Sequence, residues 1–107
     1  MDKYIKITVC VDLTVLKEYG QIDLDEVKVQ HFVTMEESAR TQDIEVLAFN
    51  CGTIDLRDFF KSDKWKNFSN GISIGEKCKL MSYLCDIMQY NWEIITREEY
   101  EEGLKND

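Results

Sequence analysis

The chain contains a single histidine, His31. A Ser-His or Cys-His nucleophile, or a multi-histidine metal centre, would have to be built on this one side chain. His31 stands between Val29 and Val33 in an alternating stretch, a pattern typical of a β-strand. We therefore interpret His31 as a packed, hydrogen-bonded strand residue and not as a general base.

Three further residues have the types that metal-dependent hydrolysis requires. Glu26 and Lys28 stand two residues apart at the start of a candidate strand, and Asp12 lies upstream. Some nucleases hold Mg²⁺ and activate water with an acid followed by an acid-x-lysine pair. In a chain that is 32% charged, such a triplet is expected by chance. A metal-dependent enzyme of nuclease type is therefore the alternative hypothesis, and the first hypothesis is a protein without catalysis.

Cysteines and glycines give no metal or nucleotide motif. The four cysteines are scattered and form no CxxC pair, whereas zinc sites favour closely spaced ligands. We interpret them as free buried thiols. The five glycines stand singly, so no phosphate-binding loop is predicted. We expect neither a metal nor a cofactor. The cysteines are Cys10, Cys51, Cys78 and Cys85.

One segment combines aromatic residues with interleaved lysines. Its aromatic residues are Phe59, Phe60, Trp65 and Phe68. They are interpreted first as a small core beneath an irregular segment, and second as interface anchors, with Trp65 the residue selected for partner binding. A further alternative is a structural or self-assembling protein in which this surface forms a homo-oligomer. The pattern also suits single-stranded nucleic acid, but the charge of the chain argues against that ligand.

Acidic residues are the most abundant candidates for binding. The net charge is −8, and the acids fall into three clusters along the chain. A negative patch attracts a basic partner from a distance and repels nucleic-acid phosphates and anionic lipid. With Trp65, the candidate partner-binding residues are Asp23, Asp25, Glu26, Glu36, Glu37, Glu98, Glu99, Glu101 and Glu102.

These residues favour a small acidic protein-binding module without enzymatic activity. Its most concrete form is an inhibitor that neutralises a basic partner such as a toxin or nuclease, as a bacterial toxin-immunity protein or a phage counter-defence protein would. The 107 residues fit a single domain, 1–107. We expect a cytoplasmic protein, because no apolar run approaches the ~20 residues of a membrane span and the start has no signal-peptide pattern.

The longest element predicted is an amphipathic helix over about 74–90. Ser73 and Glu76 have the spacing of a capping box, and apolar residues then cover about half the helix circumference. That broad face is expected to be buried. Asn91 is interpreted as a left-handed stop, followed by a strand over 92–96.

The other elements are shorter. Alternation predicts strands over 4–11 and 27–33, and an apolar run predicts a central strand over 44–49. Candidate caps at Asp12, Thr34, Asp55 and Thr96 predict short helices after each of them. The fold class is therefore α+β, a mostly antiparallel sheet of about four strands with the 74–90 helix on one face.

Overall fold

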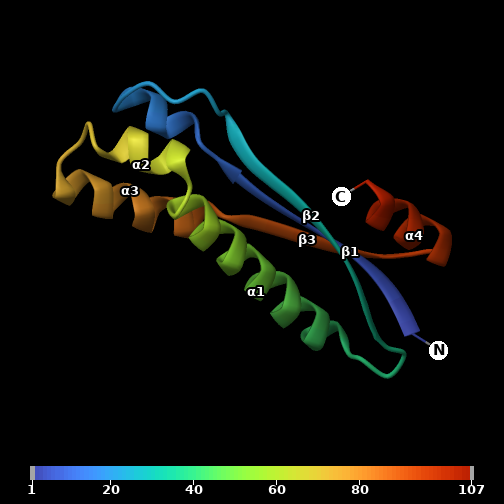
Figure 1. Ribbon diagram of the computed structural model, residues 1–107. Coiled ribbons are helices and arrows are strands. Elements are labelled where there is room, and N and C mark those ends of the chain that lie inside the picture. Colours follow the sequence, from blue (N-terminus) through green and yellow to red (C-terminus); the bar gives the residue numbers. More distant parts are fainter. Residues whose placement is uncertain (1, 107) are drawn as a thin grey trace.

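A three-stranded antiparallel sheet forms the centre of the computed structural model, which describes residues 2–106 (Figure 1). The strands are β1 (Asp2–Asp12), β2 (Glu26–Glu36) and β3 (Gln89–Ile95), in the order β2-β1-β3. β1 pairs with β2 along its whole length, from Asp2 opposite Glu36 to Asp12 opposite Glu26. β3 pairs with residues 4–10 of β1. The α+β class is confirmed, with three strands where about four were predicted.

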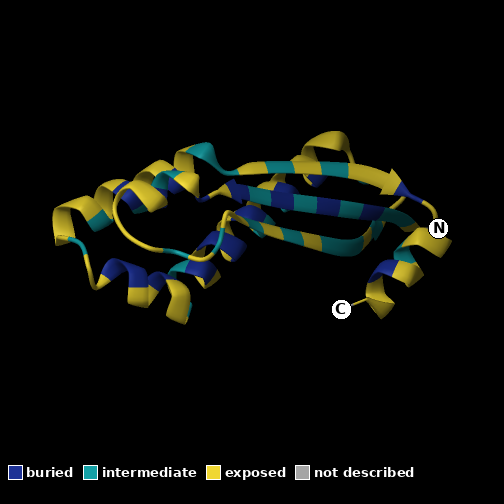
Figure 2. Ribbon diagram, turned by 90° about the horizontal axis from the view of Figure 1, so that it is seen from above, coloured by how far each residue is buried: buried dark blue, intermediate teal, exposed yellow. Residues whose placement is uncertain are grey.

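The alternation in β1 produces a sheet with one buried and one half-exposed face. Figure 2 shows the buried and intermediate positions alternating along the central strand. The intermediate positions face the opposite side of the sheet from the helical core, which we call the open face. The buried positions are Ile5, Ile7, Val9 and Val11, all 0% exposed.

The segment predicted as a central strand belongs instead to α1 (Thr41–Phe60), which covers the buried face. Its buried residues Ile44, Ala48, Asp55 and Phe59 recur at helical spacing. The prediction was wrong because Cys51-Gly52 reads as a turn. Gly52 instead allows close packing of Met88, whose sulfur lies 2.7 Å from where a Cβ would stand.

Three short elements close the core at one end of the sheet. They are η1 (Thr14–Glu18), a 3-10 helix, α2 (Asp63–Ser69) and α3 (Ile74–Ile87). Asp12 receives a hydrogen bond from the Thr14 N–H at 2.8 Å, in keeping with the short helix predicted there. The helix predicted after Thr34 is absent, because β2 continues to Glu36, and Asp55 lies inside α1 rather than at a cap.

α3 begins where it was predicted to begin, but fewer of its apolar residues are buried than predicted. The Ser73 hydroxyl accepts a hydrogen bond from the Glu76 N–H at 3.2 Å. Only Leu80 and Leu84 are buried, and Ile74 is 81% exposed. No non-glycine residue within 2–106 has a positive φ, so the predicted left-handed stop at Asn91 is wrong. The helix ends at Ile87, and β3 begins two residues later.

The last helix, α4 (Arg97–Lys105), packs on the open face near the start of β1. Thr96 caps it by accepting a hydrogen bond from the Glu99 N–H at 3.1 Å, as predicted. The Tyr100 ring lies 5.0 Å from the Tyr4 ring, and Gly103 lies against Phe32. The described part of the chain measures 51 × 27 × 18 Å and holds no helix that could cross a membrane.

Candidate functional site

Two of the three acidic clusters lie at the same end of the sheet. β2 ends at Glu36 beside Asp2, the first residue of β1. α4 starts near this end, where Tyr100 contacts Tyr4, and its second half lies against the middle of β2, where Gly103 meets Phe32. We call this region the acidic end. Its residues are Glu36, Glu37, Glu98, Glu99, Glu101 and Glu102.

The third cluster lies at the opposite end and is partly neutralised. Glu26 stands opposite Asp12, about 34 Å along the sheet from Asp2 at the usual rise of a strand. Asp23 pairs with Lys64 at 2.9 Å, and Asp25 pairs with Lys17. The hydrogen bond from Lys64, assisted by its charge, lowers the pKa of Asp23. The cluster of Asp23, Asp25 and Glu26 is therefore separate from the acidic end and less available to a cation.

α4 presents most of its acids to solvent. Tyr100 and Gly103 face the sheet. Glu101 pairs with Arg97 at 3.1 Å along the helix, while Glu98 and Glu102 form no ion pair within the described chain. Glu98 and Glu102 are four residues apart, so their carboxylates project from the same side of the helix. Uncompensated like charges at this spacing leave a local negative field.

The open face beside α4 carries a compensated charge pair. Lys6 bonds Glu93 at 2.7 Å across β1 and β3. The hydrogen bond to Glu93 and its charge raise the pKa of Lys6, with a smaller contribution from Glu99. Lys6 therefore neutralises Glu93, and it forms no ion pair with the glutamates of α4 within the described residues.

Trp65 is a core residue, as the first interpretation of the aromatic segment predicted, and not the exposed partner-binding anchor for which it was also selected. It is 1% exposed, and its ring lies 5.0 Å from Phe60 and 5.7 Å from Phe68. Phe59, at 5.8 Å from the same ring, is also buried. These aromatic side chains form the core at the helical end of the molecule. Phe59, Trp65 and Phe68 are buried and so are not an exposed surface, whereas Phe60 is half-buried.

The nuclease-type residues lie on one face of the sheet but do not form a metal cage. Asp12 and Glu26 face each other across β1 and β2, and Lys28 is opposite Cys10. Asp12 accepts the Thr14 N–H, and Glu26 accepts the Cys10 thiol at 3.3 Å. Within residues 2–106, no three His, Cys, Asp or Glu residues are grouped so that they could hold a metal ion.

The described cysteines are free thiols, but they are less buried than predicted. Cys78 and Cys85 are exposed, because the apolar face of α3 is only partly covered. Cys10 and Cys51 are half-buried. Burial is the main cause that raises the pKa of each of these two thiols, followed by the nearby carboxylates of Glu26 and Asp55, respectively. A raised pKa disfavours the thiolate, so neither thiol is an activated nucleophile.

Sequence reasoning did not identify the partner of His31. The ring Nε2 lies 2.7 Å from the Asp55 carboxylate, which is 8% exposed. This pair joins the edge strand β2 to α1. The prediction that His31 is a hydrogen-bonded strand residue is confirmed. Asp55 lies seven residues after Ala48 and four before Phe59, which places it on the buried side of the helix. This spacing was a usable signal for a buried partner of His31.

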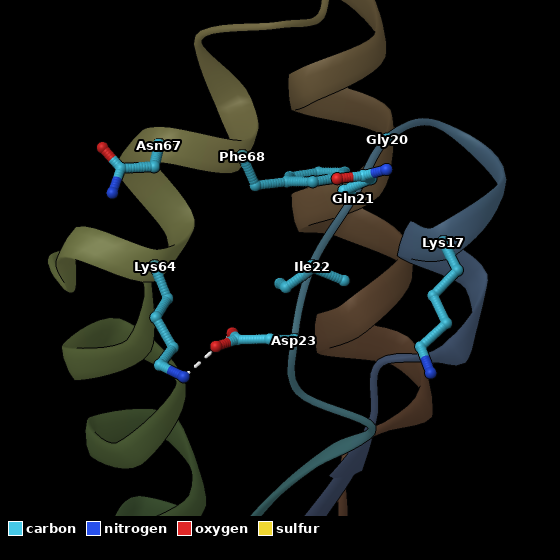
Figure 3. A pocket seen from close by; sticks show the side chains of 8 residues that line it. All are labelled: Lys17, Gly20, Gln21, Ile22, Asp23, Lys64, Asn67 and Phe68. Carbon is cyan, nitrogen blue, oxygen red and sulfur yellow. Dashed lines mark hydrogen bonds and ion pairs between the residues drawn. The ribbon is translucent and has the colours of Figure 1, made fainter.

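A hollow of about 720 Å³ lies between α2 and the loop that leads into β2 (Figure 3). Phe68 and Ile22 provide apolar surface, and the Lys64–Asp23 ion pair crosses one side of it. The two lysines at its rim, Lys17 and Lys64, are each paired with an aspartate. Because their charges are already compensated, this hollow is a weaker candidate for binding than the acidic end.

Comparisons with known proteins add no assignment. No family model, no curated protein and no solved structure matches this chain. The acidic end is therefore identified as the candidate site from the geometry of the chain alone.

Proposed function

We propose that this protein is a binding module without catalysis whose acidic end docks onto a basic surface of another protein. One observation carries the proposal. The glutamates at the end of β2 and those at the start of α4, more than sixty residues apart in sequence, lie toward the same end of the sheet. At the other end, Asp25 and Asp23 are paired with Lys17 and Lys64, respectively.

This asymmetry matters physically because a localised field orients a partner before contact. Complementary charge accelerates association and excludes partners of the wrong sign. Glu98 and Glu102 stand on a helix that the sheet holds in place, so they lose little freedom when they bind. Leu104, 46% exposed on the same helix, adds an apolar contact that slows dissociation.

The partner we favour is a basic enzyme, as in the inhibition of a toxin or nuclease by an immunity or counter-defence protein. Such an enzyme carries cationic groups where it holds nucleic-acid phosphates. Carboxylates spaced along the outer side of α4 would occupy those groups and block the site. The prediction is a stoichiometric complex that weakens as salt rises.

The test is a pull-down from source-organism lysate at low and high salt with two variants of equal charge change. Glu98→Lys/Glu102→Lys reverses the acidic end, and Glu18→Lys/Asp86→Lys reverses exposed acids elsewhere. We expect a basic protein to bind the wild type and the second variant, and its affinity for the first variant to fall by about tenfold or more. Equal loss with both variants would indicate only general charge attraction. Equal retention would remove the acidic end as the site.

A further inference from the structure

The two edges of the sheet differ in how they protect their unpaired backbone. β2 carries charges at Glu26, Lys28 and Glu36, which discourage another strand from pairing with it. β3 spans seven residues, of which Glu93 is the only charged one. An edge strand with few charges exposes N–H and C=O groups that can pair with another strand.

Exposed apolar side chains flank this unprotected edge. Ile94 on β3 is 57% exposed, although its β1 partner Ile5 is fully buried. On α1, Phe49 is 50% exposed. Phe49 packs against Tyr90 at 6.0 Å, which joins the helix to the strand. Glu45 also lies at this flank, where it accepts the Trp92 indole N–H at 3.0 Å, and the other side chains placed here are apolar enough to favour removal from water.

The apolar surface continues past the beginning of β3. A groove of about 390 Å³ lies between α1 and the end of α3, and Phe49 belongs to both the groove and the strand flank. Its other lining residues are Thr53, Leu56, Arg57, Phe60, Cys85 and Met88. We call the β3 edge together with Phe49 and this groove the β3 flank.

We propose that the β3 flank is a homodimer interface, in which β3 pairs antiparallel with β3 of a second copy. The strand sequence is self-complementary when Trp92 lies on the twofold axis. Tyr90 then stands opposite Ile94 of the second copy, and Asn91 stands opposite Glu93 of the second copy. Aromatic–aliphatic pairs stabilise a sheet, and no like charges oppose each other in this register.

The other edge does not permit an equivalent arrangement. If β2 paired with itself about His31, Glu26 would face Glu36 of the second copy at both ends of the ladder. Opposed like charges destabilise a strand pair. The sequence therefore specifies which edge a second copy uses.

Overall charge is also compatible with this dimer. A twofold axis through β3 relates antiparallel strands, so the two acidic ends point to opposite ends of the assembly. Their separation exceeds the Debye length of about 8 Å at physiological salt, and their mutual repulsion is therefore screened. The joined sheets form one six-stranded sheet with the order β2-β1-β3-β3-β1-β2.

The first test measures molar mass by light scattering and sedimentation, from about 1 µM to about 500 µM protein, since a short edge interface gives modest affinity. We expect a monomer–dimer equilibrium. Ile94→Lys, at a site already exposed, should weaken dimerisation by about tenfold or more without changing the circular dichroism spectrum. Gln30→Lys, an exposed position on β2, is the matched control and should not alter the equilibrium.

The second test determines the register in which the two β3 strands pair. In a Cys78→Ser/Cys85→Ser background, Asn91→Cys/Glu93→Cys should form a disulfide-linked dimer on mild oxidation, because these positions face each other across the twofold axis. The background alone and a single Gln30→Cys variant should not cross-link. A strict monomer over the whole concentration range overturns the proposal. A dimer whose affinity is unchanged in the Ile94→Lys variant also overturns it. A monomer whose β3 edge binds only extended peptides of other proteins overturns it as well.

Discussion

The two faces of the sheet are covered very differently. On one face, the apolar residues of β1 are fully buried beneath α1 or the helical end. On the open face, Lys6, Thr8 and Cys10 are only half-buried, and α4 covers one end. The comparison teaches that the stability of the fold comes mainly from one face. The helix on the other face is therefore free to vary its outer surface without affecting the core.

The strongest test of this difference removes the largest side chain of the helical core. Trp65→Ala should lower the free energy of unfolding by about 3–5 kcal/mol, because the indole is fully buried among other aromatic rings. Urea denaturation followed by circular dichroism measures the loss. Lys66→Ala, at the exposed neighbouring position, should change stability by less than about 0.5 kcal/mol. A loss below about 1 kcal/mol for Trp65→Ala would contradict the burial of this ring.

A smaller effect is expected on the open face. In Gly103→Ala, the new Cβ would stand 2.3 Å from the Phe32 ring, so the contact between α4 and the sheet must shift. The overpacking cost is about 1–3 kcal/mol. Hydrogen exchange should show faster exchange in α4 while protection in β1 and α1 is kept. Faster exchange throughout the molecule would show that α4 is part of the main cooperative unit.

The smallest effect concerns two half-buried thiols on opposite sides of the sheet. Maleimide labelling at about pH 8 should modify the exposed Cys78 and Cys85 before Cys10 and Cys51, whose raised pKa values leave less thiolate. Glu26→Gln removes a charge that raises the pKa of Cys10, so labelling of Cys10 should accelerate and that of Cys51 should not. Equal acceleration of both thiols would indicate loosening of the fold instead of a local electrostatic effect.

Local signals predicted much of the fold. The alternation of Ile5, Ile7 and Val9 identified β1, and the Ser73 and Thr96 caps located two helix starts. These features depend on neighbouring residues and on the period of side-chain burial, which a sequence displays directly.

Features that depend on distant packing were not predicted. Gly52 is accommodated inside α1 because Met88, from the far end of α3, occupies the space beside it. The apolar residues of α3 were expected to be buried, but the sheet does not extend beneath its first turns, and Ile74 is exposed. Amphipathicity shows that a helix has an apolar side, not how much of that side another element covers.

The candidate site was predictable only in part. Glu98 and Glu102 were identified as binding residues from the high density of acidic residues in their segment of the sequence. Their position over the open face depends on α4 folding back onto the start of β1, and no local pattern encodes the contact of Tyr100 with Tyr4. Trp65 was wrongly assigned to the surface because an aromatic residue among lysines is equally typical of a small core and of an interface.

The position of β1 between its two neighbours sets the order in which the sheet can assemble. β2 follows β1 after the connection that contains η1. β3, which completes the other side of the sheet, comes only after α1, α2 and α3, and it pairs with β1 from Gln89 opposite Cys10 to Ile95 opposite Tyr4. Closing so long a loop is slow compared with forming the hairpin. A chain that has not yet captured β3 exposes one side of its most apolar strand to solvent. The refolding yield of this protein should therefore fall as its concentration rises, because another molecule can occupy that vacant side first.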